Sequence, residues 1–131
     1  MKDEFSLEFD GYYFLYSDGP EEPGIYCIYR SNTEKEYAEL LYIGESENII
    51  ERLHNHEHYE DWQKHLRTGD ELLFSYAVVE GSAKKRQRIE AALIFKHKPV
   101  CNTQNVDNFG YETTVIKTSG KNACLCPEFR V

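Results

Sequence analysis

The sequence predicts an α/β (α+β) domain with a small, largely antiparallel three-stranded central sheet flanked by helices. Two patterns support this prediction. Short segments rich in β-branched and aromatic residues alternate with longer segments whose apolar residues have helical spacing. Gly, Pro, Asn and Ser gather between these segments, as they do in turns. The length of 131 residues and the hydrophobic content of 40% are sufficient for one domain with its own core.

The first expected unit is an antiparallel β-hairpin. Residues 24–30 and 38–44 are rich in Ile, Leu and Tyr, and the polar segment 31–35 between them favours a turn. Ser46 is a suitable N-cap for a following helix. The apolar spacing after it predicts a helix that continues, with an interruption, to about residue 66.

A third strand and a second long helix follow. Residues 72–79 are apolar and β-branched, and they predict the third strand. Residues 83–97 predict a helix that Ser82 caps and that ends before Pro99. Aromatic residues in 5–16 indicate a strand or an extended lid, and residues 111–118 allow a late strand.

The net charge of −8 is concentrated at the N-terminus. Residues 1–22 hold seven acids and one Lys, a net charge of −6, so residues 23–131 carry only −2. We therefore expect an acidic extension over 1–22, the main domain over 23–103 and a C-terminal extension over 104–131 that packs on the same domain. A basic stripe on the second helix is a predicted nucleic-acid contact, with a solvated helix face as the alternative. The stripe consists of Lys84, Lys85, Arg86 and Arg88.

The four cysteines indicate a reducing compartment. Their positions, 27, 101, 124 and 126, match neither a disulfide framework nor a four-ligand zinc site. No apolar run approaches the roughly 20 residues of a membrane span. We expect a cytoplasmic protein without a membrane contact.

Glu90 is the most informative single residue. It stands within the apolar run Ile89–Phe95 of the second helix. A carboxylate buried without a partner costs several kcal/mol, so Glu90 is expected to be paired, protonated or bound to a metal. The ordinary alternative is an ion pair with Arg86.

Four other residues surround this candidate site in the predicted fold. Arg52 and His56 are four apart on the first predicted helix, so they are expected on one face, where Arg52 suits a phosphate group. Tyr26 and Tyr42 lie on adjacent predicted strands and are expected to flank one site if they share a face. Packing of the sheet is the alternative role for these tyrosines.

The ordered motifs resemble those of the GIY-YIG endonuclease superfamily, which is found in homing endonucleases, excision-repair nucleases and some restriction enzymes. The resemblance spans about residues 23–103 and rests on Gly24-Ile25-Tyr26, Tyr42-Ile43-Gly44, Arg52, Glu90 and Lys98–Asn102. Fifteen residues separate the two motif tyrosines, more than is usual in the family, and a longer hairpin over Ser31–Glu39 explains them. The resemblance implies six catalytic residues, which are Tyr26, Tyr42, Arg52, His56, Glu90 and Asn102.

The resemblance implies metal-dependent hydrolysis of phosphodiester bonds in DNA. Glu90 is the expected ligand of Mg²⁺ (or Mn²⁺), Arg52 holds the phosphate and Tyr26 takes the proton of the attacking water. A tyrosine pKa of about 10 must fall by about three units for this role, which takes roughly 4 kcal/mol. The alternative is a non-catalytic module that binds nucleic acid or a protein. RNA remains open as a substrate, and a protein partner is expected to supply substrate recognition.

Overall fold

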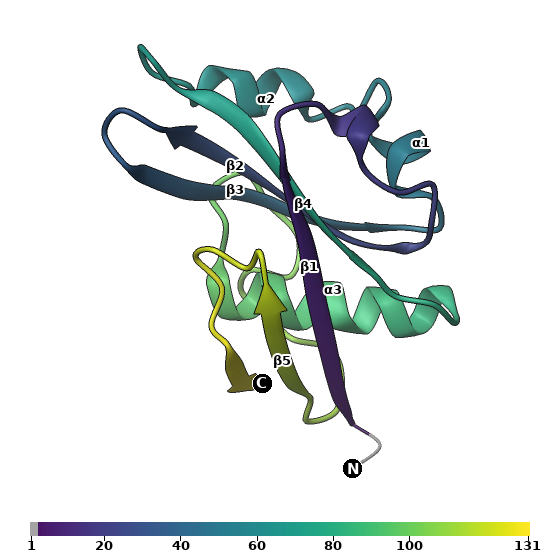
Figure 1. Ribbon diagram of the computed structural model, residues 1–131. Helices are drawn as coiled ribbons and strands as arrows, with labels where there is room; N and C mark the ends of the chain where they lie inside the picture. The colour runs from purple at the N-terminus through teal and green to yellow at the C-terminus, as the bar shows by residue number, and fades with distance from the viewer. Residues whose placement is uncertain (1–2) are drawn as a thin grey trace.

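The computed structural model describes residues 3–131, which form one curled sheet and three α-helices (Figure 1). The elements in chain order are β1 (Glu4–Tyr13), the short 3₁₀ helix η1 (Tyr16–Asp18), β2 (Gly24–Asn32), β3 (Tyr37–Ser46), α1 (Ile49–Leu53), α2 (Tyr59–Lys64), β4 (Glu71–Val78), α3 (Ala83–His97), β5 (Val115–Gly120) and β6 (Glu128–Arg130).

The sheet has six strands in the order β3-β2-β4-β1-β5-β6. The predicted mixture of strands and helices is confirmed, and the prediction of a three-stranded sheet is wrong. The hairpin β2–β3 and the antiparallel neighbour β4 form the expected part. Strands near β1 and β5 were indicated over 5–16 and 111–118, but their place in the sheet was missed, as was β6. Strands β1 and β5 pair in parallel across more than 100 residues, and no local pattern signals such a pairing.

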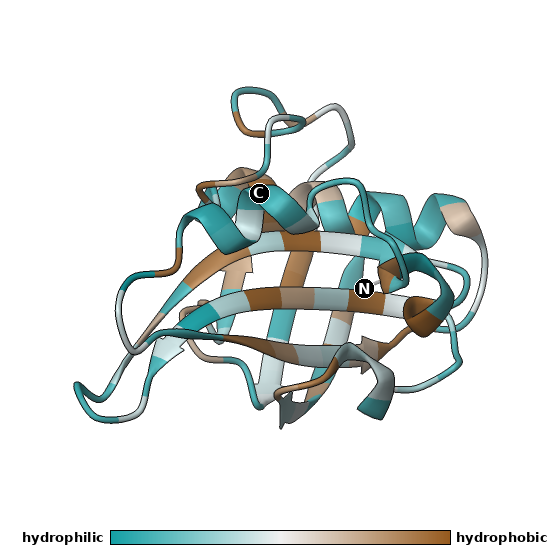
Figure 2. Cartoon of the chain, turned by 90° about the horizontal axis from the view of Figure 1, so that it is seen from above, coloured by the Kyte–Doolittle hydropathy of each residue, from teal (hydrophilic) through white to brown (hydrophobic). Residues whose placement is uncertain are grey.

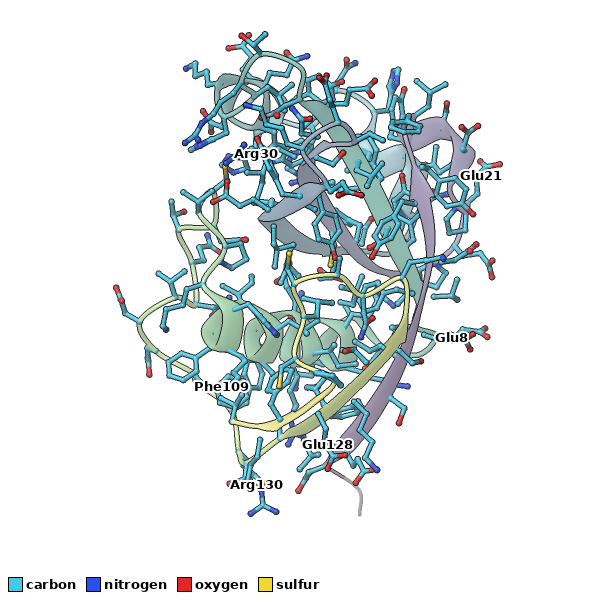
Figure 3. All side chains as sticks on the ribbon, turned by 60° about the vertical axis from the view of Figure 1, so that its left-hand side comes forward. Glu8, Glu21, Arg30, Phe109, Glu128 and Arg130 are labelled. Atoms are coloured by element: carbon cyan, nitrogen blue, oxygen red, sulfur yellow. The ribbon has the colours of Figure 1, made fainter. Side chains whose placement is uncertain are left out.

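Strand β1 joins the two halves of the sheet. Its residues Glu4–Phe9 pair with β5, and Asp10–Tyr13 pair with β4. Leu7 and Phe9 are almost fully buried, so β1 belongs to the core and is not a lid. The exposed positions within β1 are polar, although Phe14 and Leu15 directly after it are also exposed. Figure 3 shows Glu8 and Glu21 pointing outward on the same side of the molecule.

Apolar side chains fill both faces of the sheet. On one face α3, β5 and β6 cover Ile25 and Ile43, and on the other face α1 and α2 cover Ile28 and Phe74. The split follows from strand geometry, since successive side chains of a strand point to opposite faces. In Figure 2 the hydrophobic positions accordingly concentrate along the strands, while the loops are mostly hydrophilic.

The helices differ from the prediction in one place that affects the site. Helix α3 spans the predicted residues, and the Ser82 side chain accepts a hydrogen bond from the Lys85 amide. Helix α1 begins after Asn48, which caps it in place of Ser46, and ends at Leu53. Arg52 and His56 therefore do not share a helix face, and that prediction is wrong. None of the helices within residues 3–131 has the length and apolar character required to cross a bilayer.

Candidate active site

A polar cavity of about 290 Å³ lies between the β2–β3 hairpin, α1, α3 and the segment that follows α3. Five of the six predicted catalytic residues line it, and the sixth, His56, contacts one of them from behind. The lining residues are Tyr26, Tyr42, Glu45, Arg52, Glu57, His58, Glu90, Ile94, Asn102, Thr103, Gln104 and Asn105.

The two tyrosines share one face of the hairpin, as expected. Their rings stack with centroids 6.2 Å apart and an interplanar angle of 24°. Gly44 lies opposite Tyr26 in the β2–β3 register, and a Cβ at this position would overlap the tyrosine ring. A Cβ at Gly24 would likewise overlap the carbonyl oxygen of Ala77. Both glycines of the two tripeptides are therefore required for close packing.

The Tyr26 hydroxyl lies 2.9 Å from Nε2 of His56, whose side chain is fully buried. Nδ1 of His56 accepts a hydrogen bond from the backbone N–H of His58, so in the neutral ring the proton is on Nε2. Nε2–H therefore donates to the Tyr26 hydroxyl oxygen, which leaves the phenolic proton free to point elsewhere. Burial, followed by the Arg52 charge, lowers the pKa of His56 to about 4, so the ring is neutral near pH 7.

Burial also raises the pKa of the Tyr26 phenol well above its usual value, and the nearby Tyr42 raises it further. Arg52 acts in the opposite direction. Tyr26 is therefore a neutral phenol in this structure. The pKa decrease that a role as general base requires is correspondingly larger than the sequence suggests.

Glu90 is partly buried in the cavity wall, and no side chain within residues 3–131 forms a hydrogen bond or ion pair with its carboxylate. A backbone hydrogen bond from Glu45 is the contact that favours its ionised form. Arg86, its alternative partner, instead donates from Nε to Glu45 at 3.1 Å and from Nη1 to the Gly81 carbonyl. Burial raises the pKa of Glu90 to about 7, and the Glu45 charge contributes in the same direction. The alternative role of Glu90, an ion pair with Arg86, is therefore not found.

Arg52 forms an ion pair with the carboxylate of Glu57, which no sequence pattern indicated. Its Nη1 donates to Glu57 Oε1 at 2.8 Å and its Nη2 donates to Oε2 at 2.7 Å. The guanidinium beside it holds the pKa of Glu57 at about 2, so this carboxylate is ionised at neutral pH.

Asn102 holds the exposed edge of β3 beside Tyr42. Its side chain accepts from the Ile43 amide at 2.9 Å and donates to the Ile43 carbonyl at 3.0 Å. The amide thus pairs with the strand backbone as a neighbouring strand would. Asn102 positions the second tripeptide and makes no hydrogen bond to Glu90.

The predicted basic stripe lies away from the cavity. At 100° per residue, Lys84, Lys85 and Arg88 stand about 120–160° around the helix axis from Glu90. Lys84 and Lys85 are exposed, whereas Arg88 donates to Thr114 Oγ1 and pairs with Asp3 at 3.2 Å. Arg86 is buried in its ion pair with Glu45. The stripe therefore presents two free lysines on a different side of α3.

The residues present are compatible with one hard cation. Within residues 3–131 no cluster of three or more His, Cys, Asp or Glu side chains is arranged to bind a metal. Mg²⁺ needs few protein ligands, because it retains several waters and takes oxygens from its substrate. The unpartnered Glu90 carboxylate in a polar cavity fits that requirement.

Three further charged or titratable residues of the cavity were not predicted from the sequence, namely Glu45, Glu57 and His58. Glu45 directly follows the second tripeptide on β3, and this position was the available signal for it. Glu57 and His58 lie in the loop between α1 and α2, where neither helical nor strand periodicity applies.

No protein-family model and no solved structure matches this chain. Two curated proteins are similar to part of it, and both are named UvrABC system protein C. The protein from Mycoplasmoides gallisepticum is 32% identical over 95 residues, which cover 70% of this chain and 15% of the relative. The protein from Thermosipho africanus is 32% identical over 82 residues, which cover 63% of this chain and 14% of the relative. The chain thus spans about one seventh of the length of these relatives.

Proposed function

We propose that this protein is a GIY-YIG-type endonuclease that hydrolyses phosphodiester bonds in DNA with one divalent metal ion. The observation that carries the proposal is the unpartnered Glu90 carboxylate, which shares one polar cavity with Tyr26, Arg52 and Asn102. Structural carboxylates at comparable burial are normally paired. A carboxylate without a partner, beside an arginine and a tyrosine, suits a ligand that brings both a cation and an anion.

Arg52 would bind a non-bridging oxygen of the scissile phosphate. Its guanidinium is 34% exposed at the cavity, and its two terminal nitrogens already hold a carboxylate in bidentate fashion. Phosphate oxygens are recognised in the same geometry. In a cavity that substrate closes to water, this contact strengthens as charge develops on the phosphate.

Tyr26 would first lose its phenolic proton to solvent water through the cavity, and its phenolate would then accept the proton of the attacking water. The Nε2–H of His56 donates to the same oxygen and stabilises the phenolate form. His56 is thus a positioning residue for Tyr26 and not the proton acceptor. Tyr42 stacks on Tyr26 and orients the ring over Gly44.

Glu90 would hold Mg²⁺ or Mn²⁺, which stabilises negative charge on the phosphate and on the leaving oxygen when it is bound. A raised pKa makes the metal-free carboxylate partly protonated near pH 7. Metal affinity should therefore increase as pH rises through this value, since the ligand must be ionised.

DNA as the substrate rests on similarity and not on a visible binding surface. Two relatives are named as a component of a UvrABC system, and excision-repair nucleases belong to the superfamily that the motifs resemble. The free lysines Lys84 and Lys85 are the only part of the predicted stripe that is available for a phosphate backbone among residues 3–131. The net charge of −8 repels the DNA backbone. A protein partner would therefore supply much of the binding to DNA.

The proposal is tested with a panel of duplex, branched and single-stranded DNA and of RNA, in Mg²⁺ or Mn²⁺. The wild type should cleave at least one DNA substrate, and Glu90→Gln should lower the rate by about 10³-fold or more. The matched control Glu80→Gln removes an exposed acid and should cleave normally. Undiminished turnover by Glu90→Gln would exclude the metal role. Metal-independent binding without cleavage by the wild type would favour the non-catalytic module.

A further inference from the structure

The ion pair between Arg52 and Glu57 uses the same atoms that the proposed function reserves for a phosphate. Both terminal nitrogens of Arg52 donate to Glu57, at 2.8 and 2.7 Å, one to each carboxylate oxygen. A carboxylate and a phosphate offer a guanidinium the same pair of acceptors at similar spacing. The two ligands therefore cannot both take this bidentate position.

The loop between α1 and α2 places Glu57 there. Helix α1 ends at Leu53, and the chain turns back at Asn55, whose φ of 58° lies in the left-handed region. His56 then points inward, fully buried against Tyr26. The next residue, Glu57, consequently points outward and back over Arg52. Burial of His56 thus sets the position of the carboxylate.

The pair remains open to exchange with a ligand. The Arg52 side chain is 34% exposed and that of Glu57 is 63% exposed, so water reaches both partners. Ion pairs of this kind are weak, because solvent screens the charges and fixing two long side chains costs entropy. A competing anion can therefore displace Glu57 without unfolding the loop.

We propose that Glu57 is a specificity-determining residue that occupies the phosphate position on Arg52 and must be displaced by the substrate. This inference rests on the proposed role of Arg52 as the phosphate-binding residue. A single free phosphate must compete with the carboxylate of Glu57 for Arg52 and gains few other contacts. A polyanionic chain with a bound cation makes additional contacts, and their binding free energy outweighs the displacement of Glu57. Glu57 thereby disfavours small phosphate ligands and favours extended phosphodiesters.

Inorganic phosphate is the probe, measured by isothermal titration calorimetry without metal at low salt. Glu57→Gln should bind phosphate about 3- to 10-fold more tightly than the wild type. Glu60→Gln is the matched control, because Glu60 is an exposed acid three residues away without a contact to Arg52. The control should change the affinity by less than about twofold.

The same comparison in an Arg52→Gln background separates displacement from general repulsion. If Glu57 acts by occupying Arg52, the gain from Glu57→Gln disappears when Arg52 is absent. Far-ultraviolet circular dichroism and thermal unfolding verify that every variant is folded. An equal affinity of Glu57→Gln and Glu60→Gln, undetectable binding by Glu57→Gln, or a gain that persists without Arg52 overturns the inference.

These outcomes are independent of nuclease activity. Phosphate binding at Arg52 requires neither metal nor catalysis, so the inference can fail while the wild type still cleaves DNA. Conversely, a wild type that cleaves no substrate of the panel contradicts the proposed function, and the phosphate titration still decides the role of Glu57. In an active enzyme, Glu57→Gln should lower KM for short oligonucleotides more than KM for long DNA.

Discussion

Two carboxyl groups, the inaccessible one of Asp70 and the partly buried one of Glu90, lie near opposite ends of the β2–β3 hairpin and have opposite surroundings. At the end near the turn, Asp70 accepts hydrogen bonds from Arg30, Asn32 and Tyr37 at 2.8–3.1 Å and from the Arg67 amide at 2.8 Å. These donors hold its pKa well below the usual range, although the side chain is inaccessible to water. At the other end no side chain within residues 3–131 donates to Glu90, and burial raises its pKa to about 7 despite a backbone hydrogen bond from Glu45.

The difference shows how partners, and not burial alone, separate structural from ligand-binding carboxylates. The Asp70 cluster consists of Arg30, Asn32, Tyr37 and Asp70. Each carboxylate oxygen of Asp70 accepts two hydrogen bonds, and these bonds join the hairpin to the start of β4. Glu90 keeps its oxygens free at a cost to stability. A free-energy cost of this kind is typical of functional sites, where binding of a ligand compensates for it.

The largest effect is expected for Asp70→Asn. The change removes one of the two carboxylate charges that balance the buried Arg30, the other being Glu39, and replaces an acceptor oxygen by a donor group. Breaking a buried ion pair on one side strongly destabilises a protein, so the thermal midpoint should fall by roughly 10 °C. Circular dichroism measures it, with the exposed Asp107→Asn as the control. A shift equal to that of the control would show that the Asp70 cluster is not structural.

Glu90→Gln should have the opposite effect on metal-free stability. Because the folded pKa of about 7 exceeds the ordinary value of 4.5, the wild type loses stability as pH rises from about 4.5 to about 7. The amide lacks this titration, so at pH 8 the variant should be more stable by about 1–3 kcal/mol. Urea unfolding at pH 5 and pH 8 measures the difference. A variant less stable than the wild type at pH 8 would indicate a partner for Glu90.

His56 provides a pH effect of opposite sign. Its folded pKa of about 4 is below the ordinary value of 6.5, so stability is lost as pH falls from 6.5 towards 4. The two titrations oppose each other between pH 4.5 and 6.5, and the wild type should show a nearly flat profile there. In a Glu90→Gln background the loss of about 1–2 kcal/mol below pH 6.5 should become visible. Adding His56→Gln should remove it, and an unchanged profile would contradict the neutral buried histidine.

Strong local signals made part of the fold predictable. Helix α3 has the predicted bounds and its predicted Ser82 cap, because capping and the proline stop at Pro99 act within a few residues. The β2–β3 hairpin follows from two segments rich in Ile, Leu and Tyr on either side of a polar turn. Strands β1, β5 and β6 depend on pairing between the two ends of the chain, and no pattern within either end predicts the partner.

The residues around the cavity were likewise predictable only in part. The six candidate catalytic residues came from motif resemblance, and the structure brings them together around one cavity, where their catalytic roles stay a prediction. The shared helix face of Arg52 and His56 was wrong because α1 ends one residue after Arg52. The loop that follows places His56 inward and Glu57 outward through a left-handed turn at Asn55, which periodicity does not reveal.

By itself the sequence determined the hairpin, α3 and the presence of an acid within an apolar helix, since each depends on neighbours within a few positions. Only the tertiary structure decided which charges are paired. Arg86 bonds Glu45, 41 residues away, and not Glu90 one turn along its own helix, because packing of α3 against β3 brings Glu45 to it. Pairing between distant residues depends on how the layers pack, and this left Glu90 without Arg86 as a partner. The loop after α1, which periodicity does not reveal, placed Glu57 on Arg52.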